Sequence, residues 1–115
     1  MKSSILFIGY DPSLHDEIRE FIKDRRSTAH FSGPVHETIR IMDSKQFDLV
    51  VLTMNRLEDA AILRYINLNY RDTKVLIRPG KSLEDAIPAL ATGHFDILAE
   101  PFKLEELGKF IKGKV

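Results

Sequence analysis

Phe47-Asp48-Leu49-Val50-Val51-Leu52-Thr53 is the stretch of sequence that decides the fold. Residues 49–52 are all apolar, with two β-branched valines at the centre and no polar alternation. This pattern is typical of a strand whose two faces are both covered, as in a parallel sheet between layers of helices. In such sheets the functional residues lie just beyond the carboxyl ends of the strands. The residue at that position here is Thr53.

On both sides of this strand, the chain alternates between short apolar runs and helical patterns. Further strands are predicted at residues 5–8, 29–31, 75–77 and 97–99, the second of them short and at a sheet edge. Helices are predicted over residues 12–26, 35–42, 57–70, 83–91 and 104–111. Asp11-Pro12 marks the start of the first helix, as a cap followed by proline at the first helical position. This alternation predicts one doubly wound α/β domain over residues 1–115.

The third predicted helix, over residues 57–70, has apolar residues around much of its circumference. Ala61, Tyr65 and Leu68 fall on one side, and Ile62 and Ile66 widen that side. Because these residues recur at helical spacing, we expect the five of them to form one apolar side of the helix.

The composition argues against several classes of function. The chain has 115 residues, of which 17 are basic and 17 acidic, and it has no cysteine. A net charge of zero without a basic cluster argues against binding to nucleic acid or to an acidic membrane. Disulfides and thiolate metal sites are excluded, and the four histidines lack the spacing of a zinc motif. No signal peptide is visible and no apolar run approaches the ~20 residues of a membrane span, so a cytoplasmic location is expected.

Three blocks of the sequence together resemble the receiver domain of bacterial two-component response regulators. The blocks are residues 5–14 (ILFIGYDPSL), 47–52 (FDLVVL) and 93–102 (GHFDILAEPF). Their order and spacing extend the resemblance over essentially the whole chain. The resemblance implies a flavodoxin-like, doubly wound, five-stranded parallel sheet in the order 2-1-3-4-5, with helices on both faces.

The resemblance also implies where the family's chemistry would lie, and the acidic positions are all substituted. In the family, two acids after the first strand and one after the third hold magnesium, and the third acid accepts the phosphoryl group. Here these positions are Gly9, Tyr10 and Thr53. A threonine hydroxyl cannot form an acyl phosphate. Asp11 is accounted for as the helix cap, and Asp48 should lie ~16 Å from Thr53 at the other end of the strand. We expect Tyr10 to pack as a lid over the vacated pocket.

The positions that bind the phosphoryl oxygens in the family are changed as well. The hydroxyl after the fourth strand falls on Arg78, with Pro79 as the alternative, and the lysine after the fifth falls on Glu100, followed by the matching Pro101. Neighbouring strands lie ~4.8 Å apart, so side chains at their ends can reach each other. We therefore predict that Arg78 pairs with Glu100, with Asp11 or with both, and fixes the surrounding loops in one state.

The resemblance further implies a protein-binding face made by the fourth helix, the fifth strand and the fifth helix. On this chain the face would comprise Lys81, Ala86, Leu90, His94, Ile97 and Phe110. Active receivers usually have an aromatic residue where Ile97 stands.

The sequence therefore predicts a pseudo-receiver that uses no metal or cofactor and acts as a phosphorylation-independent protein-interaction module in bacterial signalling, not as an enzyme. It would bind protein partners or a second copy of itself. An alternative is the regulatory or dimerisation domain of a longer transcription regulator, because residues 112–115 end abruptly after the last helix. A flavodoxin-like cofactor enzyme is a third possibility, but it would need a Ser/Thr- and Gly-rich phosphate loop, which residues 9–12 (GYDP) do not provide.

Overall fold

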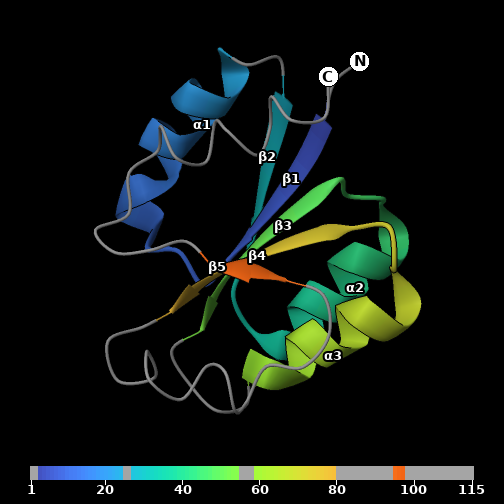
Figure 1. Cartoon of the computed structure of the whole chain (residues 1–115). Coiled ribbons are helices and arrows are strands. Elements are labelled where there is room, and N and C mark those ends of the chain that lie inside the picture. Colours follow the sequence, from blue (N-terminus) through green and yellow to red (C-terminus); the bar gives the residue numbers. More distant parts are fainter. Residues whose placement is uncertain (1–2, 25–26, 55–58, 80–94, 98–115) are drawn as a thin grey trace.

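A computed structural model describes residues 3–24, 27–54, 59–79 and 95–97 of the chain. These residues form one five-stranded parallel sheet in the order β2-β1-β3-β4-β5 (Figure 1). The strands are β1 (Ser3–Ile8), β2 (Ser27–Ser32), β3 (Leu49–Met54), β4 (Lys74–Pro79) and β5 (Asp96–Ile97). The helices are the short 3-10 helix η1 (Pro12–Leu14), α1 (His15–Lys23), α2 (Val35–Ser44) and α3 (Ala60–Asn69).

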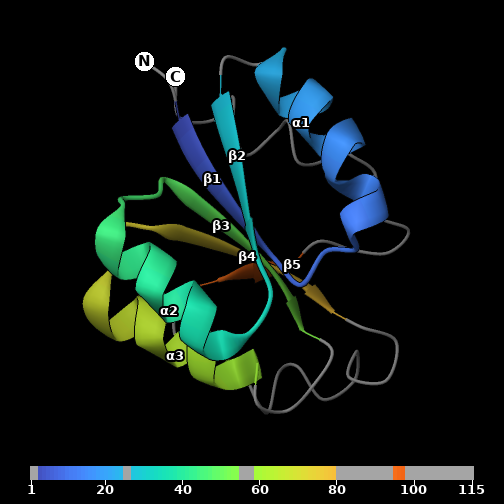
Figure 2. The same ribbon diagram turned by 180° about the vertical axis from the view of Figure 1, so that it is seen from behind.

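The predicted strand order and doubly wound architecture are confirmed. Helix α1 covers one face of the sheet, and α2 and α3 cover the other, as the two opposite views in Figures 1 and 2 show. The edge strand β2 is longer than the predicted residues 29–31, because it pairs with β1 along its whole length. The helices predicted over residues 83–91 and 104–111 lie outside the described residues.

Strand β3 lies at the centre of the sheet and is buried along its whole length. Successive side chains of a strand point to opposite faces. Leu49 and Val51 accordingly belong to the core on the α1 side, and Val50, Leu52 and Met54 belong to the core on the side of α2 and α3. Both the odd-numbered and the even-numbered residues of β3 must therefore be apolar. This explains why residues 49–52 show no alternation of apolar and polar residues.

The apolar side predicted for α3 is buried only in part, at Ile62 and Ile66. Ala61 is exposed, Leu68 is 75% exposed, and Tyr65 is half-buried, with its hydroxyl donating to Asp43 on α2 at 2.6 Å. The residues that α3 buries are Ala60, Ile62, Leu63 and Ile66. Apolar residues surround most of this helix, so periodicity does not select one side. The packing of α3 against the sheet makes that selection.

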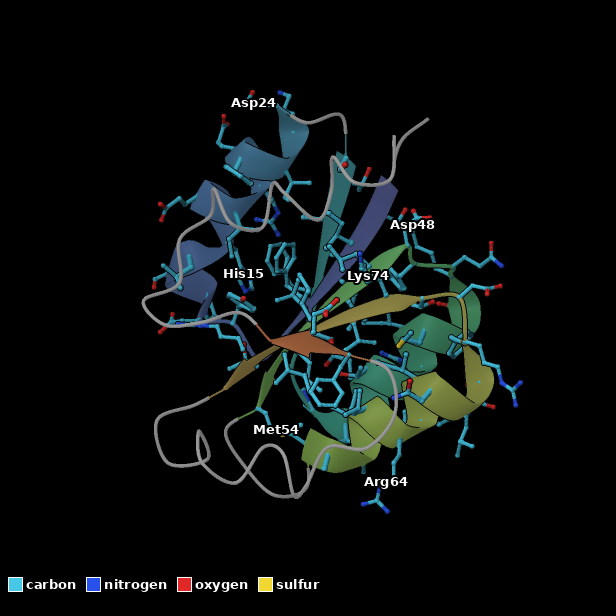
Figure 3. All side chains as sticks on the ribbon, in the orientation of Figure 1. His15, Asp24, Asp48, Met54, Arg64 and Lys74 are labelled. Atoms are coloured by element: carbon cyan, nitrogen blue, oxygen red, sulfur yellow. The ribbon has the colours of Figure 1, made fainter. Side chains whose placement is uncertain are left out.

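Asp48 joins the starting ends of three strands. Its carboxylate accepts the backbone N–H of Ser4 at 2.8 Å, and its own N–H donates to the Ser4 oxygen at 2.9 Å. Its carbonyl oxygen accepts the N–H of Lys74 at 3.2 Å. Figure 3 shows Asp48 and Met54 at opposite ends of β3. Asp48 therefore has a structural role, far from the end of β3 where Thr53 lies.

Among the described residues, no helix is long and apolar enough to cross a membrane.

Candidate functional site

The candidate site lies where β1, β3 and β4 end, and the sheet register brings its residues together. Thr53 on β3 is the register partner of Arg78 on β4. Gly9 directly follows β1, and Tyr10 and Asp11 complete the loop that leads into η1. Four of the predicted pocket residues, Gly9, Tyr10, Thr53 and Arg78, thus lie together at the ends of these strands, and Asp11 follows in the loop. Glu100 and Pro101 lie outside the described residues.

Gly9 makes the turn at the end of β1 and lies directly against Thr53. Its φ angle is +80°, a conformation that residues with a side chain rarely adopt. A Cβ atom added at Gly9 would lie 3.3 Å from Thr53 Cβ and 3.4 Å from the Thr53 carbonyl oxygen. The Gly9 N–H donates to the carbonyl oxygen of Ser32 at the end of β2. The backbone therefore leaves little space for an acidic side chain at this position.

The Thr53 side chain is buried, with only 7% of its surface exposed. Its Oγ1 atom is inaccessible and has no hydrogen-bond partner among the described residues. A nucleophilic hydroxyl needs a neighbouring base and access to its substrate. Within the part of the chain that the structure describes, Thr53 has neither, and its side chain fills space beside Gly9.

This environment predicts that Thr53→Val stabilises the fold. A buried hydroxyl without a partner costs free energy that an apolar group of the same shape does not, so the free energy of unfolding should rise by about 1 kcal/mol. Thr38→Val is the matched control, because the Thr38 hydroxyl is also fully buried but donates to the Pro34 oxygen at 2.9 Å and contacts Ser32 Oγ at 2.8 Å. That variant should lose about 1–3 kcal/mol. Denaturant unfolding of both variants checks the prediction, and a loss of stability in Thr53→Val would contradict it.

Tyr10 lies in a loop but is buried. Only 7% of the residue is exposed, and its ring belongs to the core on the α1 side of the sheet. The ring packs edge-to-face against Phe7, with the centroids 5.4 Å apart and the planes at 88°. The guanidinium carbon of Arg78 lies 5.2 Å from the centroid of the Tyr10 ring, which is the geometry of a cation–π contact.

The described residues show no contact between Arg78 and Asp11. Arg78 lies over the Tyr10 ring, and Asp11 binds the start of η1. The Asp11 carboxylate accepts the Ser13 N–H at 2.9 Å and caps η1, as predicted from Asp11-Pro12. The backbone hydrogen bond from Ser13, followed by a hydrogen bond from the Ser13 side chain, lowers the pKa of Asp11 below its usual value. The pairing of Arg78 with Glu100 stays a prediction.

A row of rings that the sequence reasoning missed leads from the surface of α1 to Tyr10. His15 stacks on Phe31 with ring centroids 3.8 Å apart, and Phe31 stacks on Phe7 at 5.5 Å. Phe7 in turn contacts Tyr10. Nε2 of His15 also donates to the backbone oxygen of Tyr10 at 3.3 Å. Phe7 and Phe31 are register partners on β1 and β2, a relation that sequence alone shows only once the strands are aligned.

The residues at the ends of these strands do not fit the magnesium ion that the resemblance to receiver domains implies. Magnesium binds oxygen ligands in octahedral geometry, usually with carboxylates among them. Gly9 and Tyr10 supply no carboxylate, and the Thr53 hydroxyl is buried. Within the described ranges, no group of three acidic, histidine or cysteine residues could hold a metal ion.

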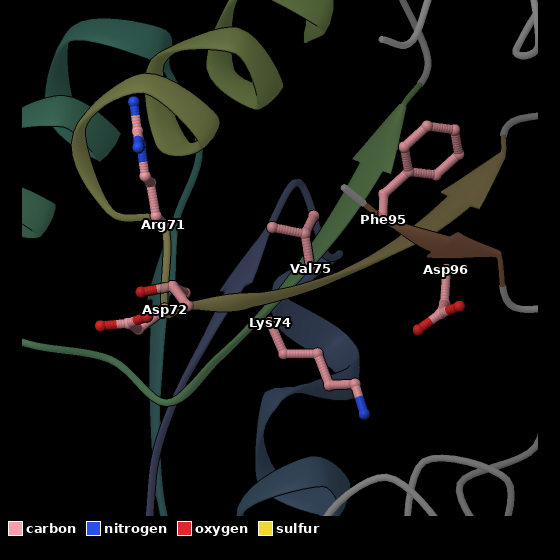
Figure 4. A pocket seen from close by; sticks show the side chains of 7 residues that line it. Arg71, Asp72, Lys74, Val75, Phe95 and Asp96 are labelled. Carbon is pink, nitrogen blue, oxygen red and sulfur yellow. The ribbon is translucent and has the colours of Figure 1, made fainter. Parts of the chain in front are cut away.

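Two shallow hollows lie at the opposite end of the sheet, on either side of the turn between α3 and β4. One has a volume of about 380 Å³ and is lined by Arg71, Asp72, Thr73, Lys74, Val75, Phe95 and Asp96. The other, of about 290 Å³, extends from this turn to Phe47 and Asp48. The side chains of Arg71 and Lys74 extend away from each other (Figure 4). The two cations that line this hollow therefore do not converge on one point.

Comparison with known proteins finds similarity in the fold. No protein-family model and no curated protein sequence matches the chain. NtrX from Brucella abortus, solved in complex with ADP, superposes with a TM-score of 0.80 at 20% identity, over 98% of this chain and 26% of its own. The receiver domain of sensor histidine kinase PA1611 from Pseudomonas aeruginosa, which has magnesium in its active-site cleft, gives 0.78 at 17% identity, over 98% and 97%. Chemotaxis protein CheY4 of Vibrio cholerae gives 0.76 at 15% identity, over the full length of both chains.

These comparisons show that the chain has the receiver fold. The chain spans about a quarter of the length of the NtrX chains that it matches. It matches the isolated receiver domain and CheY4 over nearly their whole length.

Proposed function

We propose that this chain is a pseudo-receiver, a phosphorylation-independent protein-interaction module of two-component-type signalling. The observation that carries the proposal is the close contact between Gly9 and Thr53 at the strand ends. In the receiver domains that the sequence resembles, the corresponding positions are acids that hold magnesium and accept the phosphoryl group. Here the backbone of one position packs on the side chain of the other, and neither residue can do that chemistry.

The remaining scaffold supports an interaction role. The sheet, its register and both cores are retained, while every position that would do chemistry is substituted. Binding to another protein needs this scaffold and its surface, and it needs none of the phosphoryl-transfer groups. We place the binding face on the fourth helix, fifth strand and fifth helix, with Lys81, Ala86, Leu90, His94, Ile97 and Phe110. The side chains of these residues lie outside the described part of the chain.

A second candidate is the regulatory or dimerisation domain of a longer transcription regulator. The observation that favours it is the match to only 26% of an NtrX chain, which shows that this fold occurs as one part of a larger protein. Both candidates describe the same domain without phosphoryl transfer, and they differ in whether an effector domain is attached.

The test is exposure to small phosphodonors. Incubation with acetyl phosphate, or with beryllofluoride, in the presence of magnesium should leave the amide NMR spectrum unchanged apart from weak shifts that do not saturate. Intact mass spectrometry should show no added phosphoryl group. Thr53→Asp alone should behave in the same way, because no acid stands at Gly9 or Tyr10 to hold magnesium. A stoichiometric phosphoryl adduct on the parent protein would refute the proposal.

A further inference from the structure

We propose that Tyr10 is a permanent plug that fixes the end of β4 through Arg78, in the place where phosphorylatable receivers bind an ion and a phosphoryl group. The name Tyr10 plug is used below for the Tyr10 ring together with the Arg78 guanidinium on its face. This inference rests on the proposed function and deepens it, because it names what holds the strand ends in one state.

The first argument is that the plug is held on both of its sides. The edge-to-face contact with Phe7, at 5.4 Å, anchors the Tyr10 ring in the core. Arg78 lies over the ring at 5.2 Å, and it comes from β4, two strands away from β1 in the sheet. The plug therefore ties the loop after β1 to the end of β4 across the end of β3.

The second argument is that the loop carrying Tyr10 is held at three successive residues. The Gly9 N–H donates to the Ser32 oxygen at 3.0 Å. The Tyr10 carbonyl oxygen accepts from His15 Nε2 at 3.3 Å, and Asp11 caps η1. A loop with this many fixed points presents its side chain in one direction, so the ring needs little rearrangement to meet Arg78.

The third argument concerns charge. The three positions that are acidic in the receiver family are neutral here, because they are Gly9, Tyr10 and Thr53, so none of them offers Arg78 a carboxylate. The face of an aromatic ring carries partial negative charge and attracts a cation. Arg78 and Pro79 are the last residues of β4, so holding Arg78 fixes the point from which the chain continues beyond β4.

The inference is tested with substitutions at Tyr10 that distinguish the effect of the aromatic ring from that of apolar volume. The rate at which the Arg78 Nε–H exchanges with water is measured by NMR in Tyr10→Phe, Tyr10→Leu and Tyr10→Ala, without any phosphodonor. Phe retains the π face, so its rate should stay within about twofold of the parent rate. Leu retains apolar bulk but has no π face, and Ala has neither, so both should exchange about two- to fivefold faster. Ile18→Ala, which truncates a buried residue of the same core, should destabilise the fold and leave the Arg78 rate unchanged.

Parent-like exchange in Tyr10→Ala, or equal rates in the Phe and Leu variants, would overturn the inference. These measurements need only that each variant is folded at the NMR temperature, which its amide spectrum shows directly. The outcome is separate from the test of the proposed function. Phosphorylation of the parent protein would refute the proposed function. An Arg78 exchange rate that does not depend on the residue at position 10 would refute the Tyr10 plug alone.

Discussion

Gly9→Asp is expected to destabilise the domain by about 1–3 kcal/mol, although it restores the acid that receivers have at this position. Two features cause the loss. The backbone at Gly9 has φ +80°, which costs free energy for a residue with a Cβ atom. The new Cβ would also lie 3.3 Å from Thr53 Cβ, so the end of β3 must shift to accept it. Thermal and urea unfolding of the purified variant measure the change.

Gly33→Asp is the matched control for this prediction. No atom lies within 4 Å of the position where a Cβ at Gly33 would be, and Gly33 is exposed. Its stability should therefore stay within about 0.5 kcal/mol of the parent. Equal stabilities of the Gly9 and Gly33 variants would show that the contact with Thr53 does not constrain the site. A destabilised Gly9→Asp would show that an acid at this position lowers the stability of the present fold.

Phe7→Ala is expected to have the larger effect, a loss of about 3–5 kcal/mol. Phe7 is completely buried on β1, and its ring contacts both Tyr10 and Phe31. Truncation removes the transfer free energy of the ring and leaves a cavity between the sheet and α1. Since a domain of this size has a total stability of about 5–15 kcal/mol, the variant should be close to unfolding. Urea denaturation followed by far-UV circular dichroism measures the loss.

Phe31→Ala provides the comparison for Phe7→Ala. Phe31 carries the same ring on the neighbouring edge strand, in register with Phe7, but it is only half-buried. Its truncation should cost about 1–2 kcal/mol. If Phe31→Ala proved as costly as Phe7→Ala, the row of rings would act as one unit in which burial does not set the cost of each member. If Phe7→Ala cost less than about 1 kcal/mol, the assignment of Phe7 to the core would be wrong.

The two faces of the sheet show how far sequence patterns go. Strand β3 is apolar on both of its faces, and this alone predicts burial on both faces of the sheet. The structure confirms it. Helix α3 shows the opposite case, because apolar residues at nearly every angle leave the buried side undetermined. Leu68 belongs to the same predicted apolar side as the buried Ile62 and Ile66, yet it is 75% exposed.

The sequence by itself determined the order of strands and helices along the chain and the cap at Asp11, because these depend on local pattern and on residue identity. It also shows neutral residues at Gly9, Tyr10 and Thr53, where the resemblance to receiver domains implies acids. Tertiary structure alone decided the contacts among the strand ends. Gly9, Thr53 and Arg78 are far apart in the chain, and only the parallel register places Thr53 beside Arg78 and against Gly9. The same holds for Tyr10, whose ring could have turned to solvent. Gly9 makes a left-handed turn directly before Tyr10, and His15 donates a hydrogen bond to the Tyr10 carbonyl oxygen. The Tyr10 ring then packs against Phe7. Such contacts depend on the packing of residues that are far apart in the sequence. A local sequence pattern therefore does not predict them.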